Sequence, residues 1–174
     1  LFYHLAGSFA MGIMFAYISS IAYILLTLYK VSQEQFSLLF ALNALGFIMG
    51  GQANRYFLRK YSVLQISYVA GSFTLMFSIL FFAFAATTTL SLTVFSVFLV
   101  AILFCTGLVN PNATAMSLGS VETNIGLASA LNGSSRMIIG ATVSVGIGFI
   151  ESVSLVPMTL FFIGLSLATL LFLR

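Results

Sequence analysis

Charged residues are scarce in this chain, with six basic and three acidic side chains among 174 residues. Charged side chains make up 5% of the residues and hydrophobic ones 61%, whereas soluble globular domains carry roughly 25% charged residues. This scarcity excludes a soluble globular domain and predicts an integral membrane protein. The sequence also lacks a basic patch interleaved with aromatic residues, so its net charge of +3 gives no sign of nucleic-acid binding.

Groups that carry covalent or metal chemistry are also scarce. Cys105 is the only cysteine, which excludes a disulfide framework and a Cys-x-x-Cys metal site, and we expect it to be a small buried residue. The sequence has no glycine-rich nucleotide-binding loop and no nucleophile, base and orienting group in an enzyme-like arrangement. We therefore expect neither an enzyme nor an ATP-driven pump, and no cofactor or metal.

Acidic residues are missing from the interior of the apolar segments. Glu34, Glu122 and Glu151 fall at segment ends, and His4 lies close to the start of the first segment. Because intramembrane carboxylates form the proton relays of many transporters, this chain alone is not expected to contain such a relay.

Long apolar runs occupy nearly all of the remaining sequence. About 20 residues at 1.5 Å per residue cross the hydrocarbon core of a bilayer. The sequence predicts a single all-α bundle of six transmembrane helices over residues 1–174, with short polar breaks that make neighbouring helices antiparallel. The expected helices are residues 5–29, 35–54, 62–86, 90–116, 124–149 and 155–173.

Two local patterns bear on the start of the chain. The first apolar run is too long for a signal peptide, and because it begins at Leu1 without a methionine, we expect a fragment or a chain whose start is not recorded. Ser32 followed by Gln35 has the pattern of a capping box, which supports a helix beginning there.

Basic residues predict the orientation of the bundle. Arg55, Arg59 and Lys60 gather in the break between the second and third segments, and cytoplasmic loops carry an excess of Lys and Arg. With this break in the cytoplasm, Arg174 and both chain ends are also cytoplasmic and Lys30 is external.

Small residues and one proline are expected to shape the packing. Gly46 with Gly50, and Ser129 with Gly133, lie four residues apart, a spacing that lets membrane helices approach closely. Pro111 is expected either to kink the fourth helix and serve as a gate element, or simply to end that helix at the membrane surface.

Arg136 stands near the middle of the fifth segment, where a charge costs at least about 2.5 kcal/mol. Ser129, Asn132 and Arg136 form a polar stripe at positions i, i+3 and i+7, continued by Gly140 and Val143. We expect this stripe to line a cavity. The alternative is a structural arginine that extends to the interface or caps loosened backbone.

A second polar cluster comprises Tyr17, Ser19, Ser20 and Tyr23 of the first segment, with Asn43 in the second. Tyrosines deep in a membrane helix need hydrogen-bond partners. Facing one cavity, such side chains would bind apolar or weakly polar organic compounds. A packed core with satisfied hydroxyls is the alternative.

Five short runs of the sequence form a recognisable pattern by their order and spacing: residues 15–20, 40–46, 54–55, 110–113 and 126–131. This pattern resembles the Bcr/CflA group of drug:proton antiporters in the major facilitator superfamily. The resemblance is to the carboxy-terminal half, helices seven to twelve, and covers nearly the whole chain.

The resemblance implies a transporter of two six-helix bundles that alternates between inward-open and outward-open states. This chain would supply one bundle of a proton-coupled multidrug exporter in the bacterial inner membrane, beside an amino-terminal bundle or a second copy of itself. The proton-coupling carboxylates are expected in the other half, and the substrates are small amphipathic organic compounds. The residues expected to bind substrate are Tyr17, Ser20, Tyr23, Asn43, Asn132 and Arg136.

The resemblance also marks departures from the family pattern. Gly50-x-x-x-Asn54-Arg55 is similar to the family's loop motif Gly-x-x-x-Asp-Arg, which with Arg59 would form a gating loop. Asn54 replaces its acid, so we expect an orienting and gating remnant. Arg136 stands where the family has an uncharged residue, often Gln, which motivates the hypothesis that the substrates include anions. Ile21-Ala22 stand where the family tends to have Ser-Pro.

A reading from a different class stays open. The chain would then be a membrane interaction module, or a half-transporter remnant, that packs with a partner bundle without transporting anything. An apolar face left exposed by a missing half makes self-association plausible in either case.

Overall fold

The computed structural model describes residues 2–87, 90–119, 124–150 and 154–174. These residues form six α-helices and no strand. The helices are α1 (Phe2–Tyr23), continued by the π-helical segment η1 (Ile24–Leu28), α2 (Gln33–Phe57), α3 (Val63–Thr87), α4 (Leu92–Leu118), α5 (Ile125–Gly148) and α6 (Val156–Leu173). Each predicted segment agrees with its helix to within three residues at either end.

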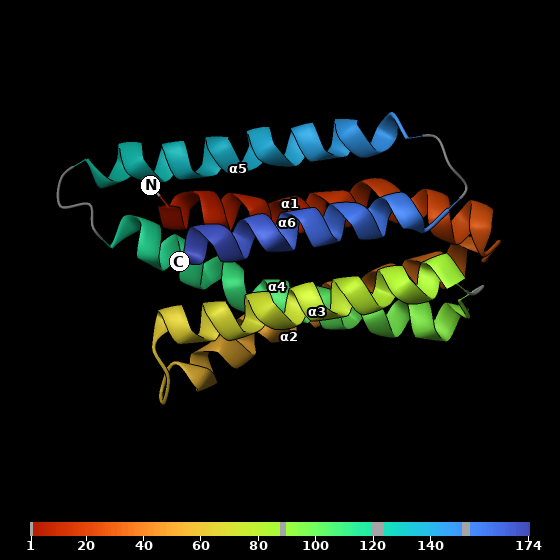
Figure 1. Cartoon of the computed structure of the whole chain (residues 1–174), viewed down its shortest axis with the longest axis horizontal. Coiled ribbons are helices and arrows are strands. Elements are labelled where there is room, and N and C mark those ends of the chain that lie inside the picture. Colours follow the sequence, from red (N-terminus) through yellow and green to blue (C-terminus); the bar gives the residue numbers. More distant parts are fainter. Residues whose placement is uncertain (1, 88–89, 120–123, 151–153) are drawn as a thin grey trace.

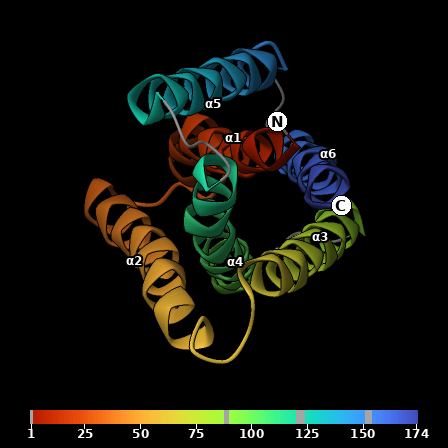
Figure 2. The same ribbon diagram turned by 90° about the vertical axis from the view of Figure 1, so that its left-hand side faces the viewer.

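Four helices form the centre of the bundle, and two lie outside it. Helices α1, α4, α3 and α6 contact one another in a ring, whereas α2 packs mainly on α4 and α5 mainly on α1 (Figure 2). The core of the ring is apolar, with Phe81, Phe95, Leu99 and Phe162 almost fully buried. Several buried Ser and Thr hydroxyls are satisfied within their own helix. Thr106, for example, donates to the carbonyl four residues earlier.

Within the described residues, five helical spans are long and apolar enough to cross a membrane: Phe2–Leu28, Gln33–Phe57, Val63–Thr87, Leu92–Leu118 and Val156–Leu173. The chain is therefore consistent with a multi-pass membrane protein. Helix α5 is not among them, because Asn132, Arg136 and several Ser and Gly residues lower its hydropathy. It nevertheless runs beside α1 along the bundle (Figure 1), and its 24 residues cover about 36 Å at 1.5 Å per residue.

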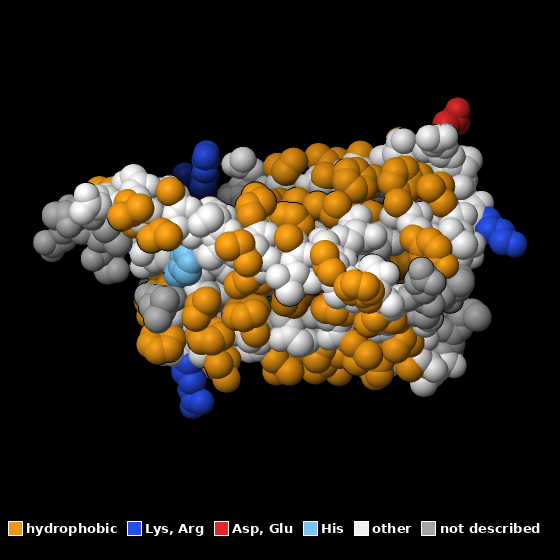
Figure 3. All heavy atoms as spheres, turned by 90° about the horizontal axis from the view of Figure 1, so that it is seen from above, with side chains coloured by type: hydrophobic (Ala, Val, Ile, Leu, Met, Phe, Trp, Pro, Cys, Tyr) orange, Lys and Arg blue, Asp and Glu red, His pale blue; other side chains and the backbone are white. Residues whose placement is uncertain are grey.

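The two ends of the bundle differ in charge. Both chain termini lie at one end, together with the turn after α2 that carries Arg59 and Lys60 (Figure 1). Lys30 and Glu34 lie at the start of α2, at the opposite end. Hydrophobic side chains cover the middle of the face seen in Figure 3, and charged ones lie toward its ends.

The second helix was predicted to end at Asn54, which is too early. Helix α2 continues to Phe57 and includes Asn54 and Arg55 in its last turns, because Asn54 finds a buried polar partner on α4. Glu122 and Glu151, all of the 120–123 stretch, and most of the 87–89 and 151–154 turns lie outside the described residues.

The capping box at the start of α2 is confirmed. The Gln35 amide donates to the Ser32 hydroxyl at 3.3 Å, and the Ser32 amide donates to the Gln35 side chain at 3.1 Å. Ser62 and Gln65 repeat the arrangement before α3, with distances of 3.2 and 3.0 Å. Both boxes satisfy backbone donors that the helix itself leaves unpaired.

The predicted close approach at Gly46 and Gly50 is confirmed, and that at Ser129 and Gly133 is wrong. Gly46 packs on Val100, and a Cβ on Gly50 would overlap the carbonyl oxygen of Phe104. Ser129 and Gly133 are exposed, and nothing lies within 4 Å of a Cβ placed on Gly133. Helix α5 instead turns Gly140 toward α1, where the Phe15 ring fills the space of the missing side chain.

Candidate functional site

Arg136 projects from the middle of α5 into the bundle. Its Nη1 donates to the Asn110 Oδ1 of α4 at a long 3.5 Å. Its Nε and Nη2 are buried and have no hydrogen-bond partner among the described residues. The guanidinium lies against Gly7 of α1, where a Cβ would overlap Nη2. An arginine cannot shed its proton in a protein, so this site holds a charge that is only weakly compensated.

A hollow of about 730 Å³ adjoins this guanidinium, between α2 and α4. Polar side chains from three helices line it alongside apolar ones, and none of the described residues that line it is acidic. Two arginines therefore face the hollow without a carboxylate in its lining. Its polar lining residues are Gln52, Asn54, Arg55, Asn110, Asn112, Thr114 and Arg136.

Asn54 and Asn112 form a reciprocal amide pair at the wall of this hollow. Each side-chain nitrogen donates to the other residue's side-chain oxygen at 2.8 Å, and both residues are buried. The pair joins the last turns of α2 to α4, next to the close contact at Gly50. An aspartate at position 54 would have no N–H group to donate to Asn112 Oδ1, so asparagine suits this neighbour.

Removing either amide should destabilise the bundle, because the remaining one would be buried without its partner. We expect Asn54→Ala and Asn112→Ala each to lower the unfolding free energy by about 1–3 kcal/mol. The double variant should lose less than the sum, with a coupling of about 1 kcal/mol. Unfolding measurements on the wild type, the two single variants and the double variant test this. A second cycle that combines Asn54→Ala with Ser166→Ala, at a distant buried position, is the control. Additive losses at Asn54 and Asn112 would contradict the prediction.

Helix α4 continues through Pro111 to Leu118, so the expectation that Pro111 ends the helix is wrong. Proline cannot donate to the carbonyl one turn earlier. The neighbouring Asn110 donates from Nδ2 to the Thr106 carbonyl at 3.3 Å and accepts from Arg136 through Oδ1. Asn110 thus connects the proline-containing turn of α4 to the buried charge on α5. A gating role for Pro111 stays a prediction.

The rest of the polar stripe holds α5 against its neighbours. Asn132 is buried and donates to Ser117 of α4 at 3.3 Å, while its Oδ1 has no partner in the described part of the chain. Ser135 lies 2.6 Å from the His4 ring of α1. Gly140 and Val143 are buried as well, but Ser129 at the start of the stripe is exposed. The stripe therefore faces the bundle from Asn132 onward.

Tyr17 and Asn43 form a separate buried pair, on α1 and α2. The Tyr17 ring stacks on Phe40 at 5.9 Å between centroids. The Asn43 side chain lies near the Tyr17 hydroxyl. Both Tyr17 Oη and Asn43 Oδ1 are buried without a hydrogen bond to any described residue. Tyr17 follows Gly7 by ten residues, about 15 Å along α1. Because Arg136 packs on Gly7, Tyr17 and Asn43 lie about that far from Arg136 along the bundle.

Ser20 and Tyr23 lie still farther along α1, beside a hollow of about 400 Å³ that α1 shares with α5 and α6. Ser20 donates to its own helix at the Ala16 carbonyl, and Tyr23 is 47% exposed. Ser19 bonds Ser144 of α5 at 2.7 Å nearby. The six residues predicted to bind substrate thus fall at three levels along the bundle, and only Asn132 and Arg136 lie together near the hollow at the basic end.

Several residues of the site were not predicted from the sequence. Asn110 and Asn112 were recognised as a motif, but their partners Arg136 and Asn54 lie 26 and 58 residues away. Gly7 carries no local signal, since its role is to leave room for a side chain of another helix. The His4 contact with Ser135 was likewise not foreseen.

Arg55 and Arg59, assigned to the gating loop, lie in different surroundings. Arg55 is helical and lines the hollow, whereas Arg59 is in the turn, with its guanidinium carbon 6.0 Å from the Tyr56 ring centroid.

Comparison of the chain with protein-family models, characterised proteins and solved structures finds no match.

Proposed function

We propose that this chain is one six-helix half of a secondary active transporter and that it supplies part of the substrate cavity. In the finer form implied by the sequence resemblance, it is the carboxy-terminal half of a Bcr/CflA-type proton-coupled multidrug exporter. The observation that carries the proposal is the buried, incompletely paired Arg136 beside a polar hollow. Ionisable residues at membrane depth are costly and commonly mark substrate or ion pathways.

The arrangement of the outer helices supports the same proposal. Helix α2 contacts mainly α4, and α5 contacts mainly α1, so each presents a broad face away from the bundle. Leu38, Leu45 and Met49 of α2 are more than half exposed, as are Leu131 and Ile138 of α5. A second six-helix bundle, from an amino-terminal half or a second copy of the chain, would cover part of these faces and close the cavity.

The chemistry of the hollow favours amphipathic organic substrates that include anions. Amide groups and the Thr114 hydroxyl supply neutral hydrogen-bonding groups, while Met11, Phe47 and Ile48 supply apolar surface. Arg136 supplies a planar cation that pairs well with carboxylate or sulfonate groups. The excess of Lys and Arg at the basic end supports a cytoplasmic location for that end and for both termini, and the resemblance implies a bacterial inner membrane.

A non-transporting interaction module is the alternative, and the exposed faces of α2 and α5 favour it equally. The two proposals differ in what a partner bundle does. In the module, the partner covers these faces and no substrate crosses the membrane. In the half-transporter, the partner completes a cavity and supplies the proton-coupling carboxylates.

We expect proteoliposomes that hold this chain alone to show no drug-dependent proton flux, because the described residues place no carboxylate at membrane depth. Proteoliposomes that also hold the six-helix bundle natively produced with it should show such flux, measured with an internal pH-sensitive dye. Flux from the chain alone would contradict the need for a separate proton-coupling half. If the two bundles form a stable complex but none of an anionic, a neutral and a cationic drug produces proton flux, the interaction module is favoured.

A further inference from the structure

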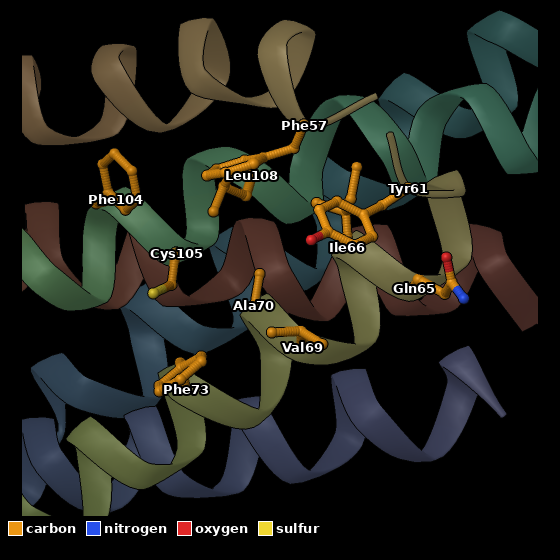
Figure 4. Close-up of a pocket in the computed structure, with 10 residues that line it drawn as sticks. All are labelled: Phe57, Tyr61, Gln65, Ile66, Val69, Ala70, Phe73, Phe104, Cys105 and Leu108. Carbon is orange, nitrogen blue, oxygen red and sulfur yellow. The ribbon is translucent and has the colours of Figure 1, made fainter. Parts of the chain in front are cut away.

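An apolar groove runs along α3 on the outer side of the bundle, and we call it the α3 groove. Its volume is about 490 Å³. The floor consists of the buried side chains Ile66, Ala70, Cys105 and Leu108, and the side chains that line the groove come from α2, α3, α4 and the turn after α2 (Figure 4). The remaining lining residues are Phe57, Tyr61, Gln65, Val69, Phe73 and Phe104.

Small residues are the reason that the groove exists. Ala70 and Cys105 stand on facing helices where larger side chains would meet, and the rings of Phe57, Phe73 and Phe104 stand around the hollow (Figure 4). The lining is almost wholly apolar, and Val69 and Phe73 at its edge are 56% and 46% exposed. A groove of this kind in the membrane-facing surface accepts hydrocarbon and offers little to a polar ligand.

In the part of the chain that the structure describes, cations lie at one end of the groove. Lys60 follows α2 in the turn that also supplies Tyr61, and its Nζ lies 5.7 Å from the centroid of the Tyr61 ring. Arg59 precedes it in the same turn. Glu34, the acidic residue that the described ranges include, lies at the other end of α2, about 36 Å away along the helix. Among the described residues no carboxylate lies in or beside this turn, so the turn can hold an anion at the groove's mouth.

We propose that the α3 groove binds an anionic phospholipid, with an acyl chain in the groove and the headgroup phosphate held by Lys60 and Arg59. The lining residues of α3 extend from Gln65 to Phe73, which is about 12 Å at 1.5 Å per residue. One leaflet of the hydrocarbon core is about 15 Å thick. The groove thus begins at the basic turn and extends through most of one leaflet, as an acyl chain does.

Charge and shape together favour this occupant over a drug or a protein segment. A neutral drug would gain nothing from the basic turn, and neither would a partner helix without acidic residues. Basic clusters at the ends of transmembrane helices attract anionic lipids, at about 1 kcal/mol for each Lys or Arg near the surface. The proposal is independent of transport and rests only on the chain lying in a membrane.

Native mass spectrometry of the purified chain with phosphatidylglycerol or phosphatidylcholine of the same acyl chains tests the proposal. Phosphatidylglycerol should bind more tightly, and the double variant Arg59→Gln/Lys60→Gln should weaken that binding about 25-fold, or about fivefold for each charge. Lys30→Gln, which removes a cation at the opposite end, should leave it unchanged. Equal binding of the two lipids, or equal effects of the variants at the two ends, would overturn the proposal.

A second measurement locates the acyl chain. Phosphatidylglycerol with a photoreactive group in its acyl chain should crosslink to residues 66–73 and 104–108, and Val69→Trp should reduce this crosslinking by filling the groove. Val145→Trp, at a similarly exposed position of α5 (57% against 56%), is the matched control and should have no effect. Crosslinks spread evenly over the outer faces of α2 and α5 would show bulk lipid contact and refute a site.

Discussion

Replacing Gly50 by leucine should separate α2 from α4 and lower the unfolding free energy by about 3 kcal/mol, at the upper end of the usual cost of overpacking. A Cβ at Gly50 would overlap the Phe104 carbonyl oxygen, and one at Gly107 would overlap the Phe47 carbonyl oxygen. Two backbones therefore meet here, and neither obstacle is a side chain that can rotate away. Because α2 packs mainly on α4, the helix has no other large contact to hold it.

Gly133→Leu is the matched control, since Gly133 lies in the interior of α5 and a Cβ there meets nothing within 4 Å. It should leave the unfolding free energy unchanged or raise it by up to about 1 kcal/mol, because glycine is the poorer helix former. Thermal or denaturant unfolding in detergent, followed by circular dichroism, compares the two variants. An equal loss in Gly133→Leu would mean that close packing at Gly50 is not the cause of the destabilisation.

The sequence predicts the helices well because their signal is local. A run of about 20 apolar residues is sufficient to define a span, and the Ser32 and Gln35 pattern marks a helix start within four residues. The end of α2 was placed too early for the same reason. Asn54 and Arg55 interrupt the apolar run, whereas the structure pairs Asn54 with Asn112, 58 residues away, and a local pattern contains no information about that partner.

The face that a helix turns toward its neighbours is also difficult to infer locally. Gly46 with Gly50 and Ser129 with Gly133 have the same spacing, yet the first pair packs closely and the second is exposed. The difference is in the facing helix, since α4 brings backbone to Gly50 while α1 approaches α5 at Gly140. For the candidate site, Arg136 was identified from its cost in a membrane, whereas Gly7 and Asn110 emerged only from the packing.

Arg136→Gln should abolish the preference for anionic over cationic substrates while leaving the bundle at least as stable. The wild-type guanidinium is enclosed with two donor nitrogens unpartnered among the described residues and a single long hydrogen bond to Asn110. An uncompensated charge in such a place costs stability, by about 2.5 kcal/mol or more at a helix centre. A neutral glutamine removes this cost, so the melting temperature of the variant should stay the same or rise.

The loss of function should be large because a charge-assisted hydrogen bond contributes about 1.5–3 kcal/mol, which is at least about tenfold in affinity. Binding of a sulfonated dye and of a cationic dye of similar size, to the chain assembled with its partner bundle, measures the preference. Arg136→Lys keeps the charge without the planar fork and should be intermediate, while Arg55→Gln, at the exposed rim of the same hollow, should have a smaller effect. If Arg136→Gln instead lowered the melting temperature and left the anion preference intact, Arg136 would be a structural residue, and the hollow would lack the charge that selects its ligand.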